Sequence, residues 1–274
     1  MNGVLYKDGR IFIKDAKNFD LKQTLDCGQA FRWSEDEGGV WRGVAYGKYI
    51  ELYKSGPDIV IEGSNKEDFE GIWAQYFDLS RDYGAIIKEF SGNKVLSAAA
   101  KASSGIRILR QEPWEALCSF IISQNNNIPR IKGIIGRLCE NFGEKCGSMY
   151  TFPAAKTLAA LTPDDLAVIR SGSRAKYIID AAQRVAAGEI DLLSLKDLSY
   201  EEAQKELLKI KGVGPKVADC ALLYGCGHIE AFPKDVWIKR ALDEFFGGKI
   251  PECALGNAGI AQQYIFYYIR ENEK

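Results

Sequence analysis

Residues 207–220, LLKIKGVGPKVADC, determine the interpretation of this chain. An apolar pair ends one amphipathic segment, Gly-Val-Gly follows, and Pro215 opens a second segment of helical character. Glycine lets a backbone turn tightly and approach a phosphate, while amides of the turn and of the next helix supply hydrogen-bond donors. The stretch predicts a helix–hairpin–helix whose Gly212 and Gly214 face a phosphate backbone. An ordinary corner between two helices remains the alternative.

Two residues near this hairpin can carry chemistry. Lys216 lies in the first turn of the second helix, and a neutral lysine amine is a nucleophile. Asp235 stands at the start of the next predicted helix, where a capping side chain is held in a fixed orientation. Taken singly, Lys216 also fits an exposed surface lysine and Asp235 a plain helix cap. Their occurrence together, in this order, favours a nucleophile with a fixed carboxylate beside it.

Outward from the hairpin, the pattern of the chain changes once. Residues 1–62 contain short β-branched or aromatic runs separated by Gly or Pro turns, which is typical of an antiparallel sheet. From residue 95 onward, amphipathic helices with short connections follow. We predict an α+β fold with an antiparallel β-sheet domain over residues 1–98 and an all-α region over residues 99–274.

The expected strands are Val4–Tyr6, Ile11–Ile13, Phe31–Trp33, Val40–Val44, Lys48–Tyr53 and Asp58–Ile61. The clearest expected helices are Glu112–Ile122, Ile128–Phe142, Arg174–Ala187, Tyr200–Leu208 and Lys216–Tyr224.

Composition excludes some classes of protein. The chain is 46% hydrophobic and 27% charged, as in ordinary globular proteins, and its net charge of −1 neither indicates nor excludes a nucleic-acid partner. It lacks a run of about 18 apolar residues and a secretory layout at its start, so we expect an intracellular protein with no membrane association. The seven cysteines lack zinc or iron–sulfur spacing and His228 is the single histidine, so we expect no cysteine-held metal.

The motifs together resemble one family. Residues 211–220 and 232–236 carry the hairpin, lysine and Pro-x-Asp pattern of the helix–hairpin–helix Gly/Pro-Asp DNA glycosylases. Residues 27–33 (CGQAFRW), 123–131 (SQNNNIPRI) and 258–266 (AGIAQQYIF) resemble the 8-oxoguanine branch of that superfamily. The resemblance spans most of the chain. It implies a TATA-binding-protein-like N-terminal sheet and a bifunctional base-excision repair enzyme, which excises 8-oxoguanine from duplex DNA and cleaves the abasic strand.

The resemblance also implies roles in the reaction. Lys216 would attack C1′ of the sugar, expel the damaged base and remain as a Schiff base that permits strand cleavage by β-elimination. Asp235 would stabilise the cationic sugar in the transition state and help to deprotonate Lys216.

For the base pocket, the resemblance implies four residues. The backbone carbonyl of Gly28 would accept the N7 proton that 8-oxoguanine has and guanine lacks, a discrimination by one hydrogen bond. Gln262 would read the Watson–Crick edge, and Phe266 and Cys220 would sandwich the flipped ring. Without the resemblance, Gln262 fits a polar helix face and Phe266 a core position.

Further residues match positions that contact DNA in the family. Asn125 and Arg130 would fill the space left by the flipped base and bond the estranged cytosine, and Arg174 would be a second cytosine reader. Ser173 stands where the eukaryotic branch has a tyrosine wedge, so we expect weaker discrimination for cytosine opposite the lesion. Trp237 replaces a phosphate-contacting histidine, so phosphate anchoring is expected to differ there.

The expected partner is duplex DNA containing 8-oxoguanine, bound by a monomer in the cytoplasm of a prokaryote or the nucleus of a eukaryote. No redox cofactor is implied, although hairpin carbonyls of the family bind a monovalent cation. Two alternatives stay open. A monofunctional glycosylase for another damaged base would use water instead of Lys216. A non-enzymatic helix–hairpin–helix DNA-binding module would not need Asp235, Gln262 or Phe266.

Overall fold

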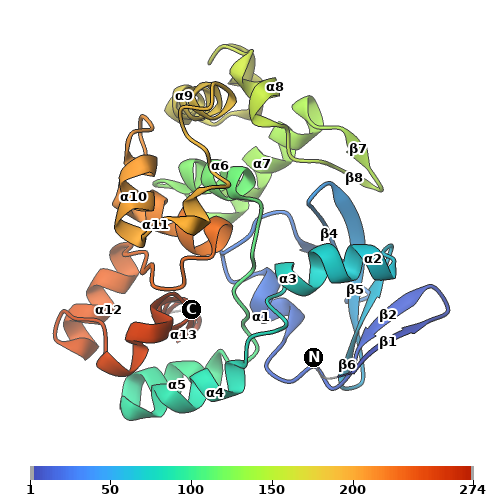
Figure 1. Cartoon of the computed structure of the whole chain (residues 1–274), viewed down its shortest axis with the longest axis vertical. Coiled ribbons are helices and arrows are strands. Elements are labelled where there is room, and N and C mark those ends of the chain that lie inside the picture. The colour runs from blue at the N-terminus through green and yellow to red at the C-terminus, as the bar shows by residue number, and fades with distance from the viewer. Residues whose placement is uncertain (1–2, 273–274) are drawn as a thin grey trace.

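The computed structural model describes residues 3–272, and it places an antiparallel sheet beside a larger group of helices (Figure 1). The sheet has six strands in the order β1-β2-β6-β5-β4-β3, and every neighbouring pair is antiparallel. The strands are β1 (Val4–Lys7), β2 (Arg10–Ile13), β3 (Ser34–Glu35), β4 (Trp41–Ala45), β5 (Lys48–Ser55) and β6 (Asp58–Glu62). The predicted α+β class is confirmed.

One expected strand is wrong. Segment Phe31–Trp33 is bent, and strand β3 begins only after it. The reason is packing: Trp33 is buried over Gly43 of strand β4, so closely that a Cβ on that glycine would lie 2.2 Å from the ring. The indole also donates a hydrogen bond to the Tyr76 hydroxyl at 2.9 Å. The segment therefore packs into the hydrophobic core and does not pair as a strand.

Most of the helices follow the sheet. Their bounds are α1 (Leu21–Leu25), α2 (Lys66–Asp68), α3 (Ala74–Tyr76), α4 (Tyr83–Glu89), α5 (Lys94–Ala102), α6 (Pro113–Ser123), α7 (Ile128–Phe142), α8 (Ala155–Ala159), α9 (Ala175–Ala186), α10 (Tyr200–Leu208), α11 (Pro215–Ala221), α12 (Val236–Phe246) and α13 (Ala258–Asn272). A short second sheet pairs β7 (Lys145–Cys146) with β8 (Met149–Tyr150). Helices α7 and α10 have the predicted bounds, whereas α11 ends earlier than predicted and continues as a π-helical turn over Leu222–Cys226.

Local sequence explains where the key helices begin. Ser199 and Glu202 form a reciprocal capping box at the start of α10, and Pro215 occupies the first turn of α11, where its missing N–H costs nothing. The Asn127 side chain caps α7 by accepting from the backbone N–H of Arg130 at 3.0 Å. These caps fix the directions of the helices that carry the candidate site.

Two hydrophobic clusters form the core. One joins the sheet to residues 66–77, and the other joins the helices, including α4 and α5. Helix α5 packs against α13, so a segment that precedes residue 98 belongs to the helical cluster. The domain boundary that we predicted between residues 98 and 99 falls inside helix α5, and it stays a prediction. The arrangement places the segment between α1 and β3 against α13, where Gln263 donates to the Cys27 carbonyl at 3.2 Å.

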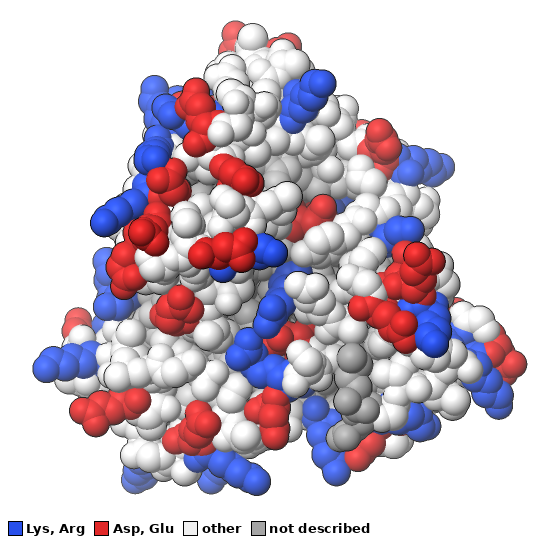
Figure 2. All heavy atoms as spheres, in the orientation of Figure 1, with Lys and Arg blue, Asp and Glu red and all other residues white. Residues whose placement is uncertain are grey.

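The surface in Figure 2 carries Lys and Arg side chains mixed with Asp and Glu side chains over the whole face shown. This mixture agrees with the net charge of −1. Within residues 3–272, the structure contains no helix that is long and apolar enough to cross a membrane.

Candidate active site

Six residues singled out in the sequence line one cavity of about 40 Å³. They come from the segment after α1, from α11, from the start of α12 and from α13, and they are Gly28, Lys216, Cys220, Asp235, Gln262 and Phe266. Elements far apart in the chain thus build the cavity together. The structure shows that these six residues line the same cavity, while the role of each residue in base recognition or catalysis stays a prediction.

Lys216 is half-buried in the first turn of α11, with its Nζ 5.3 Å from the centre of the Phe120 ring. Phe120 in turn stacks on Tyr224, with ring centres 5.2 Å apart and an interplanar angle of 19°. An ammonium group over an aromatic face is attracted to the ring. This aromatic wall orients the lysine into the cavity, so Lys216 is not an ordinary exposed surface lysine.

Cys220 lies one helical turn after Lys216 and is fully buried in the cavity wall. Burial raises the pKa of the Cys220 thiol to about 11, although the nearby Lys216 ammonium acts in the opposite direction. At neutral pH the thiol is therefore uncharged. A neutral, polarisable sulfur is suited to packing against a flat ring.

Asp235 caps helix α12, as predicted from its position before an apolar helical segment. Its Oδ1 accepts a hydrogen bond from the backbone N–H of Ile238 at 2.8 Å. The cap fixes the orientation of the carboxylate at the cavity wall. Burial raises the pKa of the neighbouring Tyr224 hydroxyl well above its usual value, and the Asp235 charge adds a smaller contribution in the same direction. The residues that follow, Val236 and Trp237, are exposed at 79% and 45%, so the first turn of α12 presents apolar surface next to the site.

Gln262 and Gln263 are both buried, but only one of them is paired through its side-chain oxygen. Gln263 Oε1 accepts from the Tyr224 hydroxyl at 2.5 Å, and its amide nitrogen donates to the Cys27 carbonyl. Gln262 Oε1 is buried with no hydrogen-bond partner among the described residues. A buried acceptor without a partner costs about 1–3 kcal/mol. Gln262 therefore presents an acceptor that a hydrogen-bond donor on a ligand would satisfy.

Gly28 adopts a left-handed conformation, with φ of 91°. A Cβ at this position would lie 3.5 Å from Ile128 Cδ1 and 3.6 Å from Phe266 Cε1, facing the cavity rim. The backbone conformation favours glycine here, whereas these contacts are ordinary van der Waals distances.

The residues expected to contact the opposite strand form a second group. The Arg174 guanidinium donates to the backbone carbonyls of Gln124 and Asn125, at 3.0 Å for Asn125, so α9 is tied to the loop before α7. Asn125 is exposed in a left-handed conformation with φ of 47°, and Arg130 is exposed on the first turn of α7. Ser173 is exposed in the turn before α9.

The two hairpin glycines have different environments. Gly212 has φ of 81°, and a Cβ there would lie 2.4 Å from the Tyr177 ring of α9. Gly214 has an ordinary φ of −100° and open space around the position of a Cβ. The backbone N–H of Lys211 donates to Asp180 Oδ2 at 2.8 Å, which also joins the hairpin to α9. Gly212 is thus needed for the turn, while Gly214 leaves room for a ligand to approach the backbone.

The described residues contain no group of three His, Cys, Asp or Glu side chains placed to hold a metal ion. His228 lies in the loop before α12 and is buried. Its Nδ1 pairs with Glu230 and its Nε2 with the Leu195 carbonyl, each at 2.9 Å. These contacts give the histidine a structural function outside the cavity.

Sequence reasoning missed four residues at the site. Phe120 and Tyr224 form the aromatic wall, Gln263 holds the segment that carries Gly28, and Arg270 lies against Phe266. Each stands in an apolar helix or next to a more conspicuous residue, so their sequence offers no separate signal. The four-residue spacing from Gln262 through Phe266 to Arg270 is the one pattern that could have found a member of this set.

The fold and this site define a class of protein, the helix–hairpin–helix base-excision enzymes, since residues 118–251 match the family "HhH-GPD superfamily base excision DNA repair protein". Residues 11–117 match "8-oxoguanine DNA glycosylase, N-terminal domain". The chain belongs to the 8-oxoguanine DNA glycosylase family.

Individual relatives agree with this assignment. The chain is 33% identical over 268 residues to "N-glycosylase/DNA lyase" of Saccharomyces cerevisiae, covering 86% of this chain and 70% of the relative. It is 31% identical over 271 residues to "Probable N-glycosylase/DNA lyase" of Methanothermobacter thermautotrophicus, covering 85% and 84%. The solved 8-oxoguanine glycosylase/lyase of Clostridium acetobutylicum, bound to duplex DNA with cytosine opposite 8-oxoguanine, superimposes with a TM-score of 0.93 at 40% identity, covering 100% of this chain and 99% of that one.

Proposed function

We propose that this protein excises 8-oxoguanine from duplex DNA and then cleaves the strand at the abasic site. Lys216 Nζ forms a bond to C1′ as the C1′–N9 bond breaks, and the base leaves with the electron pair and takes up a proton. The C1′–O4′ bond of this adduct then breaks and O4′ takes up a proton, so the sugar ring opens and the lysine is held as a Schiff base. The Schiff base acidifies the C2′ proton. Loss of that proton and cleavage of the C3′–O bond complete the β-elimination.

The unpartnered oxygen of Gln262 is the observation that carries this proposal. In the Watson–Crick edge of 8-oxoguanine, N1–H and the exocyclic amine are donors, so they satisfy the orphaned acceptor. Gly28 lines the same cavity, and in this proposal its carbonyl accepts N7–H on the opposite edge of the ring. Phe266 and Cys220 supply the two faces that hold the base between them.

Asp235 supports the chemical step electrostatically. Positive charge develops on the sugar as the base departs, and a carboxylate fixed by its helix cap is oriented before the reaction begins. The Phe120 ring holds the Lys216 ammonium group by a cation–π contact, which directs the lysine side chain toward the same cavity.

The site argues against both alternatives. A glycosylase that uses water needs no lysine at the cavity wall, yet Lys216 lines it together with Asp235. A non-enzymatic DNA-binding module needs the hairpin alone. Burial of the Gln262 side-chain oxygen without a hydrogen-bond partner is unfavourable, and a module that takes up no base gains nothing from it.

Borohydride trapping on a duplex with a single 8-oxoguanine tests the proposal. We expect the native protein to form a covalent adduct and Lys216→Gln to form none, while Lys101→Gln, an exposed lysine on α5, traps like the native protein. Base release without an adduct would favour the water-using enzyme. Binding without base release would favour the DNA-binding module.

Other properties implied by the resemblance extend the proposal. We expect a monomer that acts where DNA is held inside the cell, in the cytoplasm or the nucleus according to the organism. Backbone carbonyls of the 211–213 turn are hard oxygen donors of the kind that suit a monovalent cation bridging to a DNA phosphate. Tighter DNA binding in KCl than in tetramethylammonium chloride at equal ionic strength would support such a cation, and equal binding would contradict it.

A further inference from the structure

Arg270 lies on the face of α13 that lines the cavity formed by Gly28, Lys216 and Gln262, which we call the base cavity. Gln262, Phe266 and Arg270 follow one another at four-residue spacing, so their side chains stack along one side of the helix. The Arg270 guanidinium carbon lies 5.9 Å from the centre of the Phe266 ring and 5.5 Å from that of Tyr267. The arginine therefore supports the ring that is placed to stack on the base.

The same guanidinium contacts the segment that carries Gly28. Its Nη2 donates to the backbone carbonyl of Asp26 at 3.1 Å. Its Nη1 lies 3.8 Å from the point that a Cβ on Gly28 would occupy. The Asp26 carboxylate pairs with Lys132 of α7 at 2.8 Å, so the Asp26 carbonyl and carboxylate are each held by a different cation. Arg270 thus joins both walls of the cavity, the backbone wall and the aromatic wall.

The hydrogen bonding of Arg270 is incomplete. Its Nε is buried and has no partner among residues 3–272, although the side chain as a whole is 24% exposed. A planar guanidinium presents donors in a rigid fork, so one of these donors stays without the acceptor that would satisfy it. The two orphaned side-chain atoms on this face of α13, Gln262 Oε1 and Arg270 Nε, lie on either side of Phe266 in sequence.

We infer that Arg270 is a positioning residue for recognition of the damaged base, an inference that rests on the proposed function. By linking the Phe266 ring to the Asp26–Gly28 backbone, it holds the stacking surface and the N7–H acceptor at a fixed separation. The Nε donor is left for an acceptor that arrives with the DNA. Arg270 acts on binding and extrusion of the base, and the Schiff-base chemistry of Lys216 does not depend on it.

Two substrates separate these effects. One duplex carries 8-oxoguanine, and the other carries a preformed abasic site, which offers Lys216 its sugar but has no base to recognise. In Arg270→Met we expect kcat/KM for 8-oxoguanine release to fall about tenfold or more, as for loss of one or more hydrogen bonds, while cleavage of the abasic duplex changes less than about twofold. Arg270→Lys should recover part of the loss, because an ammonium keeps the charge over the ring but lacks the fork.

Arg81→Met is the matched control. Arg81 has a similar exposure of 26% and an ion pair with Asp78 at 2.6 Å, but it lies outside the base cavity, so both rates should match those of the native protein. Equal losses of Arg270→Met on both substrates, or no loss on either, would overturn the inference. If Arg270→Met does not fold, a native ratio of the two rates in Arg270→Lys would overturn it. A native protein that cleaves the abasic duplex but releases no 8-oxoguanine would overturn the proposed function instead.

Discussion

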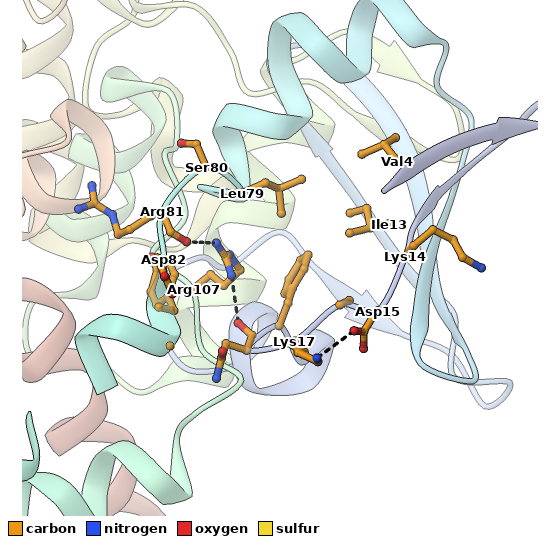
Figure 3. A pocket seen from close by; sticks show the side chains of 15 residues that line it. Val4, Ile13, Lys14, Asp15, Lys17, Leu79, Ser80, Arg81, Asp82 and Arg107 are labelled. Carbon is orange, nitrogen blue, oxygen red and sulfur yellow. Dashed lines mark hydrogen bonds and ion pairs between the residues drawn. The ribbon is translucent and has the colours of Figure 1, made fainter. Parts of the chain in front are cut away.

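Two arginines, the buried Arg107 and the partly exposed Arg270, lie beside two very different cavities. Arg107 borders a hollow of about 460 Å³ between β2 and residues 79–84 (Figure 3). Arg270 lies beside the cavity of about 40 Å³ that Gly28 and Phe266 line. The Arg107 guanidinium donates to backbone carbonyls that include Asn18 and Arg81, at 3.2 and 3.0 Å, and it lies 4.2 Å from the Tyr83 ring centre. Every nitrogen of Arg107 has an acceptor.

The two cavities differ in how far the polar groups around them are paired as well as in size. Around Arg107 the carbonyls are occupied and the nearby charges are paired, as for Lys17 with Asp15 in Figure 3. Around the smaller cavity, Gln262 Oε1 and Arg270 Nε are buried without partners. A cavity whose polar groups are already hydrogen-bonded within the protein offers a ligand little beyond contact area. An unpaired acceptor and an unpaired donor favour a ligand that forms hydrogen bonds with them.

The largest expected effect concerns the smaller of the two cavities, which Lys216 and Asp235 line. Asp235→Asn should lower the rate of 8-oxoguanine release by about 10²–10³-fold, because the fixed negative charge beside the sugar is removed. Asn caps helices about as well as Asp, so the free energy of unfolding should change by less than about 0.5 kcal/mol. Single-turnover kinetics and urea unfolding measure the two quantities. A stability loss large enough to explain the slower reaction would contradict this assignment.

Beside the larger cavity, where the Arg107 guanidinium is fully hydrogen-bonded, Arg107→Met should lower the free energy of unfolding by roughly 3 kcal/mol. The reason is that several buried carbonyls lose their hydrogen-bond donor. The ratio of 8-oxoguanine release to abasic-site cleavage should stay native, since Arg107 lies outside the base cavity. Urea unfolding followed by both assays at a temperature where the variant is folded checks this. A changed ratio would show that the two regions are coupled.

A smaller effect separates the hairpin glycines. Gly212→Ala should destabilise the protein by about 1–3 kcal/mol, because its backbone is left-handed and the Tyr177 ring fills the space. Gly214→Ala should leave stability unchanged, because nothing lies within 4 Å of the new methyl, but it should weaken duplex binding. Thermal unfolding and fluorescence anisotropy distinguish the two. Native DNA affinity in Gly214→Ala would place the phosphate elsewhere.

The smallest effect concerns the opposite base. Ser173 is exposed beside Arg174 and offers no ring to stack near the orphan base, so release of 8-oxoguanine should differ by less than about threefold among the four opposite bases. Ser173→Tyr should increase the preference for cytosine by about 1 kcal/mol. Rates on four matched duplexes provide the test, and a strict cytosine preference in the native protein would refute the expectation.

Local patterns were enough to predict much of the fold. The bounds of α7 and α10 and the cap at Asp235 follow from helical periodicity and capping, which act within a few residues. The Phe31–Trp33 strand was predicted wrongly because strand propensity cannot register that Trp33 must pack on Gly43 of another strand.

The sequence by itself determined the order of the hairpin, the lysine and the capping aspartate, and with them the candidate chemistry. Only the tertiary structure decided that Gly28, Lys216 and Gln262 share one cavity, since packing of α13 against the segment after α1 brings together residues from opposite ends of the chain. Tertiary structure also decided which buried groups lack partners, among them Gln262 Oε1 and Arg270 Nε. Hydrogen-bond satisfaction depends on atoms contributed by distant segments, so no local pattern reports it.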